Sequence, residues 1–128
     1  MNSSNKTAQH GHIGRLLPAT KNSIKGLRAA YQNEIAFRQY CWLACVLLPF
    51  AFFIANSFAE FAVLVLPIFL VLIAELLNTA VEAAIDRISL EHHHLSGLAK
   101  DLGSAAVFVA LVAVIVIWGY KIVQFVLV

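Results

Sequence analysis

A line of polar side chains interrupts the most apolar part of the sequence. It follows directly on the run FAVLVLPIFLVLI and consists of Glu75, Asn78, Thr79, Glu82 and Asp86. At ~100° per residue, these positions fall within one narrow stripe of a helix, and Glu75 and Glu82 lie about 10 Å apart along its axis. Carboxylates in such a setting can accept a proton or hold a cation, so the stripe has the composition of a catalytic site.

The acids of the stripe favour a functional role over a purely structural one. An ionisable acid inside a membrane span costs a few kcal/mol and usually faces a protein interior. The alternative is a stripe that only joins helices through hydrogen bonds, each contributing ~1 kcal/mol or less, for which Asn and Thr would be sufficient. A dry setting makes Glu75 the candidate general base. Because three thin spans cannot easily shield such a line, we expect oligomerisation to cover it.

A second polar segment, residues 89–104, contains groups suited to phosphate. Lys100 provides a point charge, and Gly97 and Gly103 would let backbone amides approach a ligand closely. The alternative is an ordinary polar loop whose charges stay in water. Adjacent histidines at 92–94 cannot all point at one ion, so we expect no dedicated metal site there.

Nucleotide chemistry in this chain would need an unusual architecture, because the sequence has no GxxxxGK[ST] loop and no HRD or DFG motif. Phosphoryl transfer requires Mg²⁺, cationic cover for the phosphates and a base near the attacking hydroxyl. Glu82 and Glu34 are the plausible pair of Mg²⁺ ligands. The alternative for Glu34 is an ion pair with Arg38 four residues later.

The composition shows what kind of molecule positions these groups. The chain has 128 residues, of which 61% are hydrophobic and 12% charged, with a mean hydropathy of +0.82. These values predict a single all-α integral membrane domain. A basic amphipathic helix at 23–39 is expected to lie in the membrane interface, because Ile24, Leu27, Tyr31 and Ile35 share one face. The remaining expected elements are an N-terminal segment over about 1–22, membrane helices at about 40–57, 60–87 and 100–125, and a cytoplasmic loop at 88–99.

Basic residues predict the orientation of these spans. They concentrate before the first span, the first connection NSFAE has none, and the second connection contains Arg87 and Lys100. The positive-inside rule then predicts a cytoplasmic N-terminus and an external C-terminus. The same residues attract anionic headgroups, and nothing indicates a nucleic-acid partner.

The stripe also carries a resemblance. ELLNTAVEAAID, residues 75–86, closely resembles the signature of the prokaryotic membrane diacylglycerol kinases, and KGLRAAYQNEIAFRQ, LSGLAKD and DLGSAAV are similar to flanking parts of that family. The AFRQ and AKDLGSAAV segments look more like the diacylglycerol branch than the undecaprenol kinase branch. The resemblance implies a homotrimer in the bacterial inner membrane that makes phosphatidate from diacylglycerol and ATP.

The resemblance also implies roles for individual residues. Glu75 would deprotonate the lipid hydroxyl, and Glu34 and Glu82 would hold Mg²⁺ bridging the ATP phosphates. The implied ATP contacts are Arg15, Asn22, Glu34, Asn78, Glu82, Glu91, His92, His93, Lys100 and Asp101. The implied lipid contacts are Arg15, Arg28, Ala29, Ala30, Tyr31, Ala36, Phe37, Arg38, Gln39, Glu75 and Ser104.

Rival functions remain at this point. An undecaprenol kinase would use the same machinery on a different lipid. A small proton-coupled transporter would use Glu75 as its proton carrier but would need neither Glu34 nor the phosphate-suited segment. A non-enzymatic helix-packing subunit would need none of these groups.

Overall fold

A computed structural model describes residues 12–127 of the chain. Within this range the structure consists of four helices and no strands: α1 (His12–Asn33), α2 (Ile35–Ile54), α3 (Phe58–Ile88) and α4 (His94–Leu127). Three of them, α2, α3 and α4, are long and apolar enough to cross a membrane. The predicted fold class, an N-terminal helix followed by three membrane spans, is therefore confirmed.

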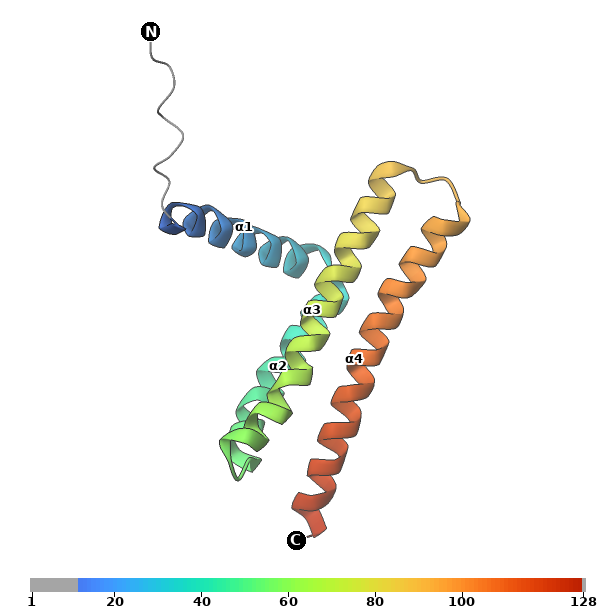
Figure 1. The fold of residues 1–128 in the computed structure, drawn as a ribbon. Helices are drawn as coiled ribbons and strands as arrows, with labels where there is room; N and C mark the ends of the chain where they lie inside the picture. The colour runs from blue at the N-terminus through green and yellow to red at the C-terminus, as the bar shows by residue number, and fades with distance from the viewer. Residues whose placement is uncertain (1–11, 128) are drawn as a thin grey trace.

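The helices form an open bundle with one crosswise member. Figure 1 shows α2, α3 and α4 running side by side, while α1 projects away from them at the end of the bundle that carries the α3–α4 loop. At 1.5 Å per residue, α2 is about 30 Å long, the thickness of a bilayer core, whereas α3 and α4 reach about 45 and 50 Å. The two long helices therefore continue beyond the apolar layer.

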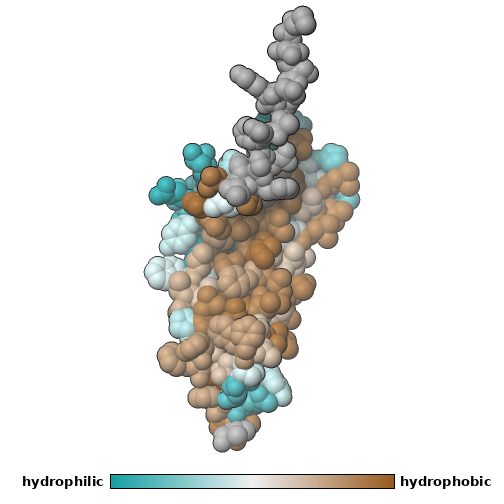
Figure 2. All heavy atoms as spheres, turned by 60° about the vertical axis from the view of Figure 1, so that its left-hand side comes forward, coloured by the Kyte–Doolittle hydropathy of each residue, from teal (hydrophilic) through white to brown (hydrophobic). Residues whose placement is uncertain are grey.

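A small apolar core holds the spans together. Its residues come from α2, α3 and α4 and are Ala44, Ala51, Ile54, Leu64, Ile68, Val71, Val114 and Trp118. The indole Nε1 of Trp118 donates to the carbonyl oxygen of Leu64 at 3.0 Å, which satisfies a polar group that lipid could not. Most other large apolar side chains are exposed, and Figure 2 shows them as a belt between hydrophilic groups at the two ends. This pattern is the one expected of a surface in contact with lipid.

The first helix boundary differs from the predicted one. The helix predicted over 23–39 is observed over His12–Asn33, and residues 35–39 belong to α2. The helix is interrupted at Glu34, whose backbone is extended, with φ of −106° and ψ of 116°. The guanidinium of Arg38 stabilises this elbow by donating to the carbonyl oxygens of Tyr31 (3.2 Å) and Gln32 (2.9 Å) at the open end of α1.

The loop between α3 and α4 is also shorter than predicted. Residues 94–99, predicted as part of the loop 88–99, form the first turns of α4. The helix begins there because the Nδ1 of His93 accepts a hydrogen bond from the amide of Leu95 at 3.2 Å and thereby acts as a cap. Gly97 and Gly103 are helical, so the prediction that their backbone amides approach a ligand is wrong.

Candidate active site

Glu75 is a buried acid in the middle of α3. Its residue exposure is 6%, and the negative charges of Glu34 and Glu82 both act on it. Tyr40 of α2 lies near enough to interact electrostatically with Glu75 as well. Within the described chain this acid is covered, whereas Asn78, Thr79 and Glu82 of the stripe are half-buried and Asp86 is exposed. The position suits a proton acceptor screened from bulk water.

Asn78 connects Glu82 to the packing of α3 against α4. Its Nδ2 donates to Glu82 Oε1 at 3.0 Å, one helical turn away. Its Oδ1 is buried without a hydrogen-bond donor and lies in the space that a Cβ at Gly103 would occupy. Glycine at 103 is therefore what allows the amide to sit between the helices and orient the Glu82 carboxylate.

Glu34 approaches the stripe from the elbow between α1 and α2. Although it is the N-cap of α2, its side chain makes no capping hydrogen bond. Arg38 is engaged with the α1 carbonyls, and the ion pairs found among residues 12–127 are Lys100–Asp86 and Lys121–Glu60. The alternative interpretation, in which Glu34 pairs with Arg38, is therefore wrong, and the Glu34 carboxylate remains available for a ligand.

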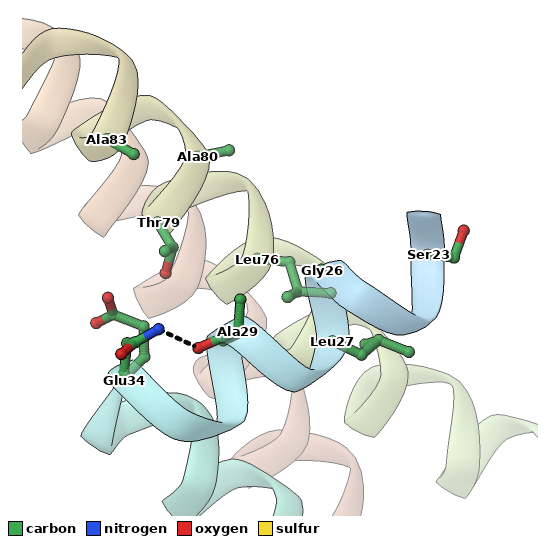
Figure 3. Close-up of a pocket in the computed structure, with 11 residues that line it drawn as sticks. Ser23, Gly26, Leu27, Ala29, Glu34, Leu76, Thr79, Ala80 and Ala83 are labelled. Carbon is green, nitrogen blue, oxygen red and sulfur yellow. Dashed lines mark hydrogen bonds between the residues drawn. The ribbon is translucent and has the colours of Figure 1, made fainter. Parts of the chain in front are cut away.

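A cavity of about 620 Å³ lies between α1 and α3. Figure 3 shows α1 crossing the segment of α3 that carries Leu76, Thr79, Ala80 and Ala83. Mostly small and apolar side chains line the cavity, with Glu34 as its acid. Such a space can accept an apolar molecule that carries one polar group toward the acids.

The predicted lipid contacts are distributed unevenly around this cavity. Ala29 and Ala30 line it, whereas Ser104 lies on α4 and is not among the lining residues. Arg28, Tyr31 and Gln39 are exposed, and Ala36 and Arg38 are half-buried in or near the first turn of α2. Phe37 is only 4% exposed and belongs to the packing between helices. Arg15 lies in α1, but its side chain is outside the part that the structure describes.

The predicted nucleotide contacts lie at the α3–α4 end of the molecule, apart from Asn22, which is exposed on α1. Glu91 and His92 are exposed in the loop, His93 caps α4, and Lys100 and Asp101 lie on α4. Lys100 forms an ion pair of 2.6 Å with Asp86 and also interacts with the charge of Glu82. The sequence places Asp86 on the stripe, but no role was predicted for it. Its spacing of four residues from Glu82 is the signal that places it on the same helix face as that acid.

The carboxylates fit Mg²⁺ only as part of a larger ligand set. Among residues 12–127, no three His, Cys, Asp or Glu side chains form a group that could hold a metal ion. Mg²⁺ is commonly held by one or two carboxylates together with water and substrate phosphates. Glu34 and Glu82 provide hard oxygen donors near Glu75, so the donor chemistry suits an ion that arrives with a nucleotide.

Comparisons with known proteins show which family the sequence matches. Residues 21–122 match the family model described as prokaryotic diacylglycerol kinase. A protein named diacylglycerol kinase from Haemophilus influenzae is 49% identical over 107 residues, covering 84% of this chain and 91% of the relative. The proteins of the same name from Pseudomonas aeruginosa and Escherichia coli K12 are 51% and 42% identical, covering 84% and 81% of this chain and 87% and 85% of the relatives.

Proposed function

The chain belongs to the prokaryotic diacylglycerol kinase family, and we propose that it transfers the γ-phosphoryl group of ATP to the free hydroxyl of diacylglycerol, forming phosphatidate. The observation that carries this proposal is the buried Glu75, flanked by Glu34 and Glu82, beside a cavity that is open to an apolar substrate. The lipid stays in the membrane while ATP comes from water, and the acids lie between the two.

Glu75 acts as the general base in this proposal. Its carboxylate takes the proton of the diacylglycerol hydroxyl as the hydroxyl oxygen forms a bond to the γ-phosphorus. The bond between that phosphorus and the bridging oxygen breaks on the opposite side, and ADP leaves with the electron pair. Burial of Glu75 excludes water, which would otherwise compete with the lipid hydroxyl as the attacking group.

Glu34 and Glu82 would hold Mg²⁺ together with the phosphate oxygens of ATP. The ion would supply positive charge against the negative charge that develops on the transferred group. Asn78 fixes one oxygen of Glu82, which leaves the other oxygen of that carboxylate for the metal. The elbow at residue 34 places an acid from outside the α3 stripe in the cavity that Thr79 and Ala83 of α3 also line.

The nucleotide occupies the α3–α4 end, and the lipid enters from α1. Lys100 and Asp101, with Glu91, His92 and His93 in the loop, contact ATP, and Arg15 and Asn22 approach from α1. The small residues Ala29 and Ala30 leave room for acyl chains in the cavity. Arg28, Tyr31 and residues 36–39 border the path by which the headgroup reaches Glu75. Ser104 lies on α4 outside the cavity, and only the resemblance to the family supports its contact with the lipid.

The proposed setting is the bacterial inner membrane, with the N-terminus cytoplasmic and the protein assembled as a homotrimer. The basic residues before α2 support this orientation, and α1 lies at the same end as the α3–α4 loop, which would place both on the ATP side (Figure 1). A groove of about 380 Å³ with Gly103, Ala106, Ala110 and Ala113 along α4 would accommodate a helix of a second copy.

One assay tests the proposal. The purified protein in mixed micelles is given radiolabelled ATP, Mg²⁺ and either diacylglycerol or undecaprenol. We expect label in phosphatidate and little in undecaprenyl phosphate. Preferential labelling of undecaprenol would contradict the proposed substrate, and absence of label in either lipid would contradict the proposed reaction.

A further inference from the structure

An ion pair joins α3 to α4 just beyond the acids of the site. The Nζ of Lys100 lies 2.6 Å from Oδ1 of Asp86, across the loop of residues 89–93. The side chains of Lys100 and Asp86 are 40% and 49% exposed. Exposed ion pairs stabilise a fold only slightly, so stability does not account for the short, well-formed contact.

The surroundings of the pair connect it to the site. Asn78, Glu82 and Asp86 follow one another at intervals of four residues on α3, and the first two are hydrogen-bonded at 3.0 Å. The charge of Glu82 acts on Lys100 as well. The ammonium bonded to Asp86 is therefore held about one helical turn beyond Glu82, the carboxylate proposed to hold Mg²⁺.

The ammonium retains donors for a ligand. A lysine ammonium has three N–H donors, and the hydrogen bonds of the described residues engage one of them, with Asp86. A lysine side chain free in water loses rotamer entropy when it is fixed. An acid that holds the ammonium in advance reduces that loss when a phosphate binds. Protein kinases use the same arrangement when a glutamate holds their phosphate-binding lysine.

We propose that Asp86 is a positioning residue, which holds the Lys100 ammonium beside Glu82 so that its remaining N–H groups meet the phosphates of ATP. The proposal rests on the kinase function proposed above and deepens it. If the ion pair only joined α3 to α4, its loss would affect folding but not the affinity for nucleotide. The affinity for nucleotide therefore distinguishes the two roles of Asp86.

The first test replaces Asp86 with Asn. We expect the KM for ATP to rise about tenfold, because the Lys100 ammonium is then no longer held in place, while the KM for the lipid stays within about twofold. Asp86→Glu should recover most of the ATP affinity because it restores a carboxylate. Arg87→Gln serves as the matched control, because it removes a neighbouring exposed charge that belongs to neither of the two ion pairs, Lys100–Asp86 and Lys121–Glu60. A wild-type KM for ATP in Asp86→Asn would overturn the proposal.

The second test exchanges the partners in one protein, Asp86→Lys with Lys100→Asp. The exchange keeps an ion pair between α3 and α4 but moves the ammonium from residue 100 to residue 86, away from the position proposed to meet ATP. Positioning predicts a restored midpoint with ATP affinity still at least about tenfold weaker, and recovery of both would overturn the proposal.

Equilibrium dialysis of labelled ATP on the same proteins separates this inference from the proposed reaction. If the wild type binds ATP but phosphorylates neither lipid, the proposed reaction is wrong. The difference in ATP binding between the wild type and Asp86→Asn still decides the role of Asp86 in that case. Equal binding by the two proteins would overturn that role, and a weakening of about tenfold would support it.

Discussion

At the scale of single residues, the burial of Glu75 is the feature with the clearest consequence. It is 6% exposed and shares its surroundings with two further acids. Glu75→Gln keeps the size and removes the proton acceptor, so we expect turnover to fall by at least about 100-fold while ATP binding is largely retained. Lipid phosphorylation and ATP dialysis are the two measurements. Turnover at the wild-type rate would contradict the general-base role, and Glu75→Asp, with a shorter carboxylate, should lie between.

Glu82 supports a separate prediction, because one of its oxygens is fixed by Asn78. Glu82→Gln removes the charge that would bind Mg²⁺, so the Mg²⁺ concentration for half-maximal activity should rise about tenfold or more. A titration of activity against free Mg²⁺ at saturating ATP measures this. Arg87→Gln changes one charge on the next turn and should titrate like the wild type. An unchanged titration in Glu82→Gln would remove this acid from the metal site.

At the scale of helices, Gly103 decides how closely α4 packs against the stripe. A Cβ at 103 would overlap Oδ1 of Asn78 and lie 3.3 Å from its Cγ, whereas a Cβ at Gly119 on the same helix meets nothing within 4 Å. Gly103→Ala must displace the amide that orients Glu82, so we expect a loss of about 1–3 kcal/mol in stability together with most of the activity.

The control for this prediction is Gly119→Ala, which should be neutral or slightly stabilising because alanine favours a helix. Thermal unfolding in detergent and the lipid assay measure both variants. If Gly103→Ala behaved like Gly119→Ala in both measurements, close packing at residue 103 would not matter for the site.

The helices also show how far the sequence could predict the structure. The α3 stripe was predictable because polar residues stand out against an apolar run at helical spacing. The elbow at Glu34 was not, because the apolar periodicity continues through it and neither Gly nor Pro marks it; its stability comes from Arg38 reaching back to α1. The start of α4 was missed because histidine is an uncommon cap and the glycines resembled a loop. The pairing of Asp86 with Lys100 depends on packing of α3 against α4, which periodicity alone does not specify.

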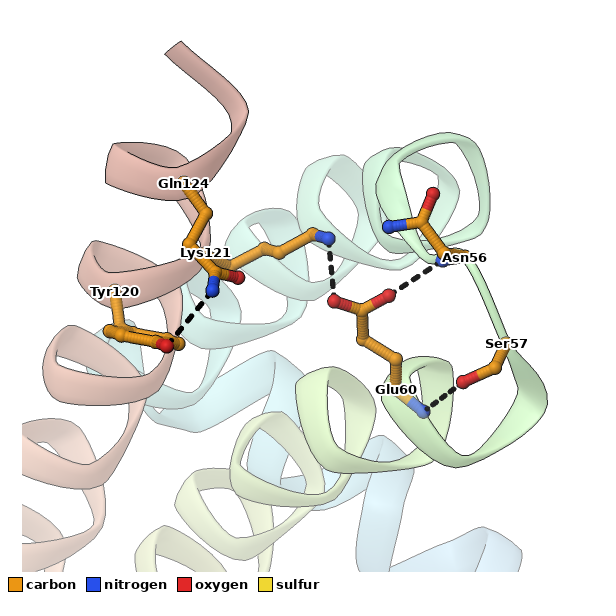
Figure 4. Close-up of polar contacts among 6 residues, drawn as sticks. All are labelled: Asn56, Ser57, Glu60, Tyr120, Lys121 and Gln124. Atoms are coloured by element: carbon orange, nitrogen blue, oxygen red, sulfur yellow. Dashed lines mark hydrogen bonds and ion pairs between the residues drawn. The ribbon is translucent and has the colours of Figure 1, made fainter. Parts of the chain in front are cut away.

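At the scale of the whole molecule, an ion pair joins α3 to α4 at the end opposite the candidate site. Figure 4 shows Lys121 Nζ contacting Glu60 Oε1 at 2.5 Å, while Glu60 Oε2 accepts from the amide of Asn56 at 2.6 Å. Ser57 caps α3 by accepting from the amide of Glu60. Glu60 thus fixes the start of α3 and holds the end of α4 at the same time.

Removal of either partner of this pair should lower the thermal midpoint, but not equally. The Lys121 side chain is 8% exposed and that of Glu60 29% exposed, so an unpaired Lys121 is the more unfavourable of the two. We expect Glu60→Gln to lower the midpoint more than Lys121→Met, with little effect on the KM for ATP because the pair lies at the far end of α3 and α4. Thermal unfolding of both proteins decides the order, and the reverse order would contradict this account of burial.

Assembly gives the last prediction, because the exposed apolar belt leaves open which face of the bundle meets other copies. The groove beside Gly103 is lined by small residues of α4, among them Ala106, and lies against exposed Leu70, Ile73 and Leu77 of α3. Small residues let membrane helices approach closely. Ala106→Phe would fill the groove, so we expect chemical cross-linking in detergent to give less of the proposed trimer than it gives with the wild type. Ala105→Phe adds the same ring at an exposed neighbour outside the groove and should leave the trimers intact. If instead only Ala105→Phe reduced the trimers, copies would meet through a different face of α4.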